Sequence, residues 1–239
     1  MSLKRPYRPP LYTRFTRPLL KALIRPIFHL LSDVHVQGVE NVPRAGAYIV
    51  AANHISIYDP PFILAFWPHI LETIGAEVVF HRPGQGQLLR LYGTIPVNRN
   101  GYDHELLERM IDLLEQGRRV MIAPEGRRSH QVGMQQARPG IAYIAEKSGA
   151  PVIPVGVVGT TPDLWERMRR GERPRLELRI GRPIRLPPIE AKGEARRLAR
   201  QENADLVMRY IAGLLPPEYH GYYAGRAIPP QTDQPNSSL

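Results

Sequence analysis

The sequence of 239 residues contains no cysteine. Disulfide bonds, thiolate nucleophiles and cysteine-ligated metal sites are therefore excluded, and the absence fits a reducing compartment. Long apolar runs are also missing, because Lys21, Arg25 and Pro26 interrupt the N-terminal stretch before it reaches the roughly 18 to 20 residues that cross a bilayer. The same stretch lacks the small-residue cleavage site of a secretory signal. We therefore expect a chain that does not span a membrane.

Acidic residues are scarce at the N-terminus, although the whole chain has 22 of them against 32 basic residues, for a net charge of +10. Seven basic residues precede the first acid, Asp33: Lys4, Arg5, Arg8, Arg14, Arg17, Lys21 and Arg25. A basic arm of this kind suits RNA, DNA or an anionic membrane surface. The apolar residues between the charges decide which of these partners it favours.

These apolar residues lie on the side of a helix opposite the basic ones. At about 100° per residue, one narrow stripe carries Arg14, Arg17, Lys21 and Arg25, and the broad opposite face carries Phe15, Leu19, Leu23, Ile27, Leu30 and Leu31. Such a helix is typical of the membrane interface, whereas nucleic-acid arms usually interleave polar or stacking residues. We predict that residues 1–32 form a basic amphipathic membrane-binding segment, which Pro26 breaks or kinks. The alternative is a core helix whose basic residues face solvent.

Segments typical of strands alternate with segments typical of helices. The expected strands are 34–36, 47–52, 77–80, 93–99, 119–123, 152–158 and 176–180, the last as an edge strand. The expected helices are 60–74, a short one through 88–91, 102–116, one that begins at 140, and 194–214. This alternation predicts a single α/β domain over 33–224, with a largely parallel mixed sheet flanked by helices and an N-terminal amphipathic membrane-interface helix. The Pro, Gln, Ser and Asn content predicts a disordered tail over 225–239.

His54 and Asp59 stand at the junction of a buried strand and a helix. The strand over 47–52 ends just before His54, and Asp59-Pro60 is a helix-start signature with proline at the first helical position. Such a loop can bring the carboxylate against one imidazole nitrogen and leave the other facing a cleft as a general base. The simpler alternative is a loop histidine and a helix cap.

Polar side chains follow three of the predicted strands. They are the His54 and Asp59 pair, Arg99, and the turn Glu125-Gly126-Arg127. In an open α/β sheet, ligands bind at the C-terminal edge of the strands because strand ends and helix starts converge there. We therefore expect one cleft to hold all three groups.

Four segments resemble the sequence blocks of glycerolipid acyltransferases, the family typified by 1-acyl-glycerol-3-phosphate acyltransferase. The NHxSxxD block is present as Asn53, His54, Ser56 and Asp59. The segment 93–99 is similar to the second block, 124–129 to the PEGTRS block and 152–155 to the fourth. The resemblance runs from about Val36 to Ala224.

The resemblance implies an enzyme that moves a fatty acyl group from acyl-CoA or acyl carrier protein to a free hydroxyl of a lysophospholipid. The first candidate acceptor is 1-acyl-glycerol-3-phosphate, which gives phosphatidic acid. His54 is then the catalytic base that takes the hydroxyl proton, and Asp59 orients its imidazole. No bound cofactor or metal is implied. The expected partners are the two substrates and an anionic membrane surface on the cytoplasmic side, with acyl carrier protein as a further one and no nucleic acid.

The other block residues are expected to bind the acceptor. Arg99 is matched to the arginine that contacts the glycerol phosphate, an anion that a planar guanidinium suits. Glu125 is expected to hydrogen-bond the glycerol hydroxyls, and the Gly126 backbone to allow close approach. The binding set also includes Arg127, Ser129, Asn53 and Ser56. Of these, Ser56 is interpreted as a loop hydrogen bonder rather than a nucleophile.

The sequence departs from the family pattern around the acceptor headgroup. Asn98 stands where many relatives have Asp, Arg127 where they have Thr, Ala123 where Phe is common, and Phe80-His81-Arg82 where lysine is frequent. These changes leave another lysolipid or a glycolipid open as the acceptor, although Arg127 and Arg128 favour an anionic one. The donor, the acyl-chain length and the oligomeric state are also open.

Three other classes of protein fit part of the pattern. A noncatalytic membrane-surface protein explains the basic helix but needs no His54 and Asp59 pair. A metal protein needs a third ligand at suitable spacing, and without it the pair is a poor zinc or iron set. A nucleic-acid binder needs a platform of basic and aromatic residues, which the sequence lacks.

Overall fold

The computed structural model describes residues 7–97, 104–129 and 131–230. Its centre is a seven-stranded sheet in the order β1-β7-β6-β2-β5-β3-β4. The strands are β1 (Asp33–Gln37), β2 (Ile49–Ala52), β3 (Glu72–Ala76), β4 (Ile95–Val97), β5 (Val120–Ile122), β6 (Val152–Val158) and β7 (Arg175–Ile180). Neighbouring strands are parallel except for the antiparallel pair β6 and β7. The predicted α/β domain with a largely parallel mixed sheet is confirmed.

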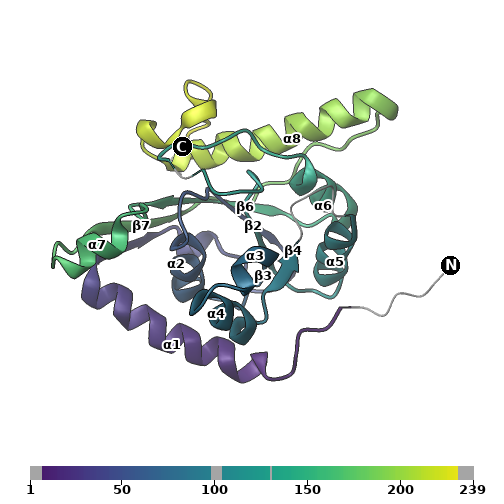
Figure 1. Cartoon of the computed structure of the whole chain (residues 1–239). Helices are drawn as coiled ribbons and strands as arrows, with labels where there is room; N and C mark the ends of the chain where they lie inside the picture. The colour runs from purple at the N-terminus through teal and green to yellow at the C-terminus, as the bar shows by residue number, and fades with distance from the viewer. Residues whose placement is uncertain (1–6, 98–103, 130, 231–239) are drawn as a thin grey trace, which may run out of the picture.

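Helices cover both faces of this sheet (Figure 1). They are α1 (Thr13–Leu31), α2 (Asp59–Phe66), α3 (Glu77–Phe80), α4 (Gln85–Tyr92), α5 (His104–Glu115), α6 (Gly140–Ser148), α7 (Leu164–Arg169) and α8 (Gly193–Leu214), with the short 3₁₀ helices η1 (Val39–Asn41), η2 (Pro217–Tyr219) and η3 (Gly221–Tyr223). Helices α5, α6 and α8 share one hydrophobic cluster with one face of the sheet, and α1 and α2 share a second cluster with the other face. The result is a three-layer α/β/α arrangement.

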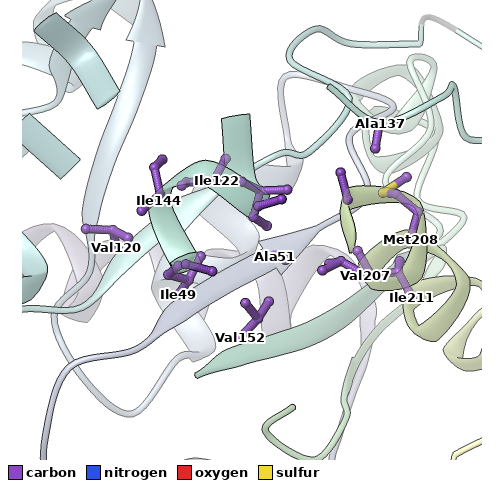
Figure 2. Close-up of a cluster of buried hydrophobic side chains, with 14 of the residues drawn as sticks. Ile49, Ala51, Val120, Ile122, Ala137, Ile144, Val152, Val207, Met208 and Ile211 are labelled. Carbon is purple, nitrogen blue, oxygen red and sulfur yellow. The ribbon is translucent and has the colours of Figure 1, made fainter. Parts of the chain in front are cut away.

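The central strand β2 is buried on both faces. Ile49 and Ala51 belong to the cluster that contains α8 (Figure 2), whereas Val50 and Ala52 belong to the cluster that contains α2. All four residues are buried. Because helices cover both faces, this strand is a continuous apolar run rather than an alternation of polar and apolar residues.

The predicted helix over 60–74 is present but too long, and the predicted strand over 77–80 is wrong. Helix α2 ends at Phe66, since Trp67 precedes Pro68 and a residue before proline is disfavoured in the helical region. The strand is β3, one segment earlier than predicted, and the residues that follow it form the short helix α3. The β-branched Thr73 and Ile74 inside β3 were the local signal for a strand.

The prediction that 176–180 is an edge strand is also wrong. Strand β7 lies between β1 and β6, and the edges of the sheet are β1 and β4. The alternation that indicated an edge has another cause. Glu177 forms ion pairs of 2.7 Å with both Arg175 and Arg179, so the charged residues of this inner strand pair with one another.

The remaining predicted elements agree with the structure, with small differences in their ends. Of the predicted segment 93–99, residues 95–97 form β4 and residues 98–99 lie outside the described residues. The predicted disordered tail, 225–239, is described only as far as residue 230. Within that part, Ile228 donates a backbone hydrogen bond of 2.9 Å to the carbonyl of Arg209 on α8.

Helix α1 turns its apolar stripe outward. The exposed fractions are 80% for Phe15, 58% for Leu19 and 55% for Leu23. The basic stripe is turned partly inward, with Arg17 only 4% exposed and the Lys21 ammonium donating to the carbonyl of Trp67. This arrangement contradicts the alternative of a core helix with solvated basic residues.

Pro26 does not break α1, the first of the two effects that the sequence predicted for it. The helix continues past it to Leu31. Proline removes the N–H that the carbonyl of Ala22 would accept in a regular helix. Ala22 itself is exposed.

A buried ion pair holds α1 on the domain. The two terminal nitrogens of Arg17 lie 2.9 and 2.7 Å from the two carboxylate oxygens of Glu72, the first residue of β3. The Nε of Arg17 also donates to the carbonyl of Tyr92 at the end of α4 (2.7 Å). Arg118 pairs with Glu72 from the other side (2.8 Å). Bidentate geometry on a buried carboxylate makes this contact far stronger than a surface pair.

We expect Arg17→Met to lower the free energy of unfolding by about 3 kcal/mol, because it leaves the buried Glu72 with only one cationic partner. The exposed Arg14 lies on the same stripe, so Arg14→Met is the matched control and should change stability by less than about 0.5 kcal/mol. Urea denaturation monitored by circular dichroism measures both values. Equal stability of the two variants would contradict an anchoring role for Arg17.

Candidate active site

The site lies at the C-terminal ends of the central parallel strands. His54 and Asp59 follow β2, and Glu125 follows β5, its neighbour in the sheet. The strand β6 pairs with β2 on the other side. The convergence that the sequence predicted is therefore present for the first and third of the three groups, while Arg99 lies outside the described residues.

His54 and Asp59 form a hydrogen-bonded pair. Nδ1 of His54 lies 2.8 Å from Oδ2 of Asp59. The same oxygen accepts the backbone N–H groups of Ile55 and Ser56, at 2.8 and 2.9 Å. Asp59 is only 1% exposed. An ionised carboxylate only accepts, so Nδ1 carries the proton and Nε2 is the basic nitrogen left for a ligand.

The turn after β5 interlocks with the His54 loop. The backbone N–H of His54 donates to Oε1 of Glu125 (2.9 Å), and the carbonyl of His54 accepts the N–H of Ser129 (3.0 Å). The second oxygen of Glu125 accepts the backbone N–H of Gln135 (2.8 Å). Both carboxylate oxygens of Glu125 are thus engaged by backbone groups, and this side chain ties two loops together.

Glu125 is a buried acid, 2% exposed. Burial, with a smaller contribution from the nearby Asp59 charge, raises its pKa from 4.5 to about 7. The two backbone N–H donors oppose this shift because they stabilise the ionised form. Glu125 therefore changes its charge near neutral pH, beside the imidazole that it helps to hold.

An apolar cavity of about 380 Å³ opens beside the pair. His54 and Asp59 line it, and most of the rest of its wall is apolar, including Ile63, Ile74, Met110, Met121, Ile141 and Ile144. Its volume is in the range of ordinary small-molecule sites. A wall of this kind with one imidazole suits a ligand that is mostly hydrocarbon and reacts at one end.

Arg128 adds positive charge near Asp59, and Arg82 adds positive charge near Arg128. Burial and the neighbouring Arg82 charge lower the pKa of Arg128, while the Asp59 carboxylate opposes this shift. Among the described residues, neither guanidinium forms an ion pair with a carboxylate. Two close cations without a carboxylate between them favour an anionic ligand. The sequence analysis weighed both arginines but placed neither in the binding set.

Arg127, Ser129 and Gly126, which the sequence placed in the binding set, have local partners. The Nε of Arg127 donates to the side chain of Gln135 (2.6 Å), and the Ser129 hydroxyl donates to the carbonyl of Gln131 (2.6 Å). Gly126 lines the cavity and has a φ of +70°. This positive φ favours glycine, and a Cβ there would also press on the Arg138 side chain, 2.7 Å from its Cδ.

Asn53 and Ser56, also in the predicted binding set, are buried and engaged by the protein. The side-chain amide of Asn53 donates to the carbonyl of Val157 (3.0 Å) and accepts its N–H (2.7 Å). This pair of bonds fixes the end of β2 against β6. The Ser56 hydroxyl accepts the N–H of Tyr58 (3.0 Å), the loop role that the sequence analysis gave it.

Sequence reasoning did not single out Thr160. Its hydroxyl donates to Oδ1 of Asp59 (2.5 Å), and the residue is fully buried. The signal was available, because Thr160 follows the buried strand over 152–158 at the same edge of the sheet as His54. Among the described residues, no group of three or more His, Asp or Glu side chains lies close enough together to hold a metal ion.

The raised pKa of Glu125 predicts a pH-dependent stability. The folded protein holds this proton more tightly than the unfolded chain, so stability from this group is present below about pH 4.5 and is lost as the pH rises through about 7. The loss amounts to about 3 kcal/mol. We therefore expect the difference in free energy of unfolding between the wild type and Glu125→Gln to change, in favour of the variant, by this amount as the pH rises from about 4.5 to about 7.

Urea denaturation at a series of pH values measures this difference. The exposed Glu218 provides the control, because Glu218→Gln should leave the pH dependence unchanged. A stability difference between wild type and Glu125→Gln that stays constant from pH 4.5 to pH 8 would contradict the burial of an acid with a raised pKa.

Comparison with known proteins gives consistent matches. The profile of the acyltransferase family matches residues 33–158. A chloroplastic 1-acyl-sn-glycerol-3-phosphate acyltransferase of Brassica napus is 30% identical over 128 residues, which are 52% of this chain and 37% of that protein. The 1-acyl-sn-glycerol-3-phosphate acyltransferase alpha of Ovis aries is 26% identical over 164 residues, 67% of this chain and 55% of that protein.

The fold is similar to a solved structure as well. The crystal structure of the 1-acyl-sn-glycerophosphate (LPA) acyltransferase PlsC from Thermotoga maritima matches with a TM-score of 0.59 and 26% identity, over 82% of this chain and 79% of that one. The chain spans less than two thirds of the length of the curated relatives. Because the family profile covers more than half of the chain, and the fold agrees with a solved relative, the protein belongs to the acyltransferase family.

Proposed function

We propose that this protein is an O-acyltransferase that moves a fatty acyl group from an acyl thioester to the free hydroxyl of a lysophospholipid. The principal acceptor we propose is 1-acyl-glycerol-3-phosphate, with phosphatidic acid as the product, and the donor is acyl-CoA or acyl carrier protein. One observation carries the proposal: a hydrogen-bonded pair of His54 and Asp59 opens on an apolar cavity. The names of the matched relatives support the same reaction.

The chemistry follows from the free imidazole nitrogen. Nε2 of His54 takes the proton of the lysolipid hydroxyl while the oxygen of that hydroxyl attacks the carbonyl carbon of the thioester. The tetrahedral intermediate then collapses, the carbon–sulfur bond breaks, and the imidazolium returns the proton to the leaving thiolate. Asp59 keeps the proton on Nδ1 and stabilises the imidazolium. No protein nucleophile is needed, and the buried Ser56 is already hydrogen-bonded to its own loop.

The cavity and the arginines divide the substrates between them. The apolar wall suits a fatty acyl chain, with its thioester end at His54. Arg82 and Arg128 suit the acceptor's phosphate, and we keep Arg99 as a third phosphate ligand on the strength of the sequence block. We assign Glu125 to holding the His54 loop, because backbone N–H groups occupy both of its oxygens. Gly126 leaves room at the cavity wall.

We further propose that the protein is a peripheral membrane protein that lies on the cytoplasmic face of a membrane through α1. Among the described helices, none is both long and apolar enough to cross a bilayer. The exposed apolar stripe of α1 suits insertion among acyl chains, while the exposed Arg14 and Arg25 suit anionic headgroups. This placement brings the enzyme to a lysolipid that resides in the membrane.

A panel of substrates tests the proposed reaction. Purified protein is incubated with vesicles, labelled acyl-CoA or acyl carrier protein, and a series of lysolipids that includes monoacylglycerol and a glycolipid. Mass spectrometry identifies the lipid product. Phosphatidic acid formed from 1-acyl-glycerol-3-phosphate supports the proposal, and acylation of only an uncharged acceptor would overturn the assignment of the arginines.

We expect His54→Ala to lower kcat by about 10²- to 10⁴-fold, because the variant lacks the general base. The matched control is His35→Ala, since His35 also pairs with an aspartate, Asp33 at 2.8 Å, but lies half-buried on the edge strand β1. The control should retain full activity. Unchanged turnover of His54→Ala would contradict the role of His54 as the base. A wild type that binds vesicles but shows no turnover would identify a noncatalytic membrane-surface protein instead.

We expect Leu19→Asp to weaken binding to anionic vesicles by about tenfold to a hundredfold, because a buried leucine contributes about 1.5 to 3 kcal/mol. Leu198 on α8 provides the control, since it is 60% exposed against 58% for Leu19 but lies on another layer of the fold. Leu198→Asp should leave the affinity unchanged. Sedimentation with vesicles measures both affinities, and equal losses would contradict a specific role for α1.

A further inference from the structure

Thr160 lies in a sharp turn directly after β6. It follows the last residues of β6, beyond the segment 33–158 that the family profile matches. The preceding Gly159 has a φ of +87°, and a Cβ there would lie 2.1 Å from the carbonyl oxygen of Arg175. Only glycine fits this position, and the turn directs Thr160 back toward the loop after β2.

The hydroxyl of Thr160 meets the one Asp59 oxygen that the loop after β2 leaves without a donor. Oδ2 of Asp59 accepts from the His54 imidazole and from the N–H groups of Ile55 and Ser56. Oδ1 accepts from Thr160 at 2.5 Å. An ionised carboxylate has no proton to give, so the threonine is the donor. Among the described residues, Thr160 is the only donor to this oxygen that the hydrogen bonds show.

The position of Thr160 is itself supported from behind. The backbone N–H of Gly159 donates to the hydroxyl of Tyr219 in η2 (3.0 Å). Tyr219 is 6% exposed, and its carbonyl accepts the N–H of Met134 (3.0 Å). The C-terminal segment therefore braces the turn that carries Thr160, from a part of the chain about 160 residues after His54.

We propose that Thr160 is a positioning residue of the active site: its hydroxyl holds the second oxygen of Asp59 and fixes the plane of the carboxylate that orients His54. Held at both oxygens, the carboxylate cannot rotate about its Cβ–Cγ bond. If it is held only at Oδ2, the carboxylate rotates about this bond, and its hydrogen bond to Nδ1 of His54 lengthens. The inference rests on the proposed function because it assigns His54 the role of base.

Kinetics test the proposal with three variants of the full chain. Thr160→Val keeps the shape and removes the donor, and we expect kcat to fall about tenfold to a hundredfold, in line with the loss from a misplaced catalytic group. KM for both substrates should stay within about twofold, because Thr160 touches neither. Thr160→Ser should restore kcat. Thr73→Val is the control: it removes a buried hydroxyl of β3 that is hydrogen-bonded to Thr94 (3.0 Å), and it should leave kcat unchanged.

A spectroscopic measurement makes the result independent of turnover. The Nδ1–H proton of His54, assigned by its loss in His54→Gln, gives a downfield NMR signal in the wild type because it is hydrogen-bonded to Asp59. We expect the signal to move upfield and broaden in Thr160→Val and to stay in place in Thr160→Ser and Thr73→Val. If Thr160→Val does not fold, Thr160→Ala carries the same comparison.

The outcomes separate this inference from the proposed reaction. A wild type without acyltransferase activity but with a displaced Nδ1–H signal in Thr160→Val overturns the reaction and supports the positioning role. An active wild type whose kcat and Nδ1–H signal are both unchanged in Thr160→Val overturns the positioning role alone. A fall in kcat that Thr160→Ser does not restore also overturns it, because the loss then comes from packing rather than from the hydroxyl.

Discussion

The buried carboxylate of Asp59 is the interaction on which the site depends. A charge removed from water is stable only if hydrogen bonds replace its hydration, and four donors from two segments meet this one. Three come from the loop after β2 and one from the turn after β6. The need to satisfy one acid thus fixes the loop, the imidazole and the register of two neighbouring strand ends at the same time.

A second buried acid, Glu72, has a similar role where α1 meets the domain. Its carboxylate forms ion pairs with Arg17 of α1 and with Arg118, which lies just before β5. Because a cation from α1 is used to bind the domain, the helix docks by its basic stripe and leaves its apolar stripe exposed. An amphipathic helix in a soluble protein docks the other way round. The polarity of this contact is therefore what gives the domain a surface suited to lipid.

Local sequence patterns were enough to predict a largely parallel mixed sheet and most of the helices and strands. They failed where one pattern had two interpretations. The apolar stretch after Asp59 was extended as a helix through Pro68, although a proline there ends α2 and frees β3 to form. The alternating charges of β7 indicated an edge strand, yet Glu177 forms ion pairs with Arg175 and Arg179 on a strand inside the sheet. Both errors arise because the pattern of apolar and charged residues along a segment does not show which other segments it packs against in the fold.

The sequence by itself determined the chemistry of the site: a histidine and an acid five positions apart after a buried strand, and an acidic turn after another. Only the tertiary structure decided that Glu125 holds the His54 backbone rather than facing solvent, that Thr160 reaches Asp59, and that α1 turns its leucines outward. The physical reason is that each of these contacts joins residues far apart in the chain. Parallel strand pairing brings them together, and no local pattern encodes it.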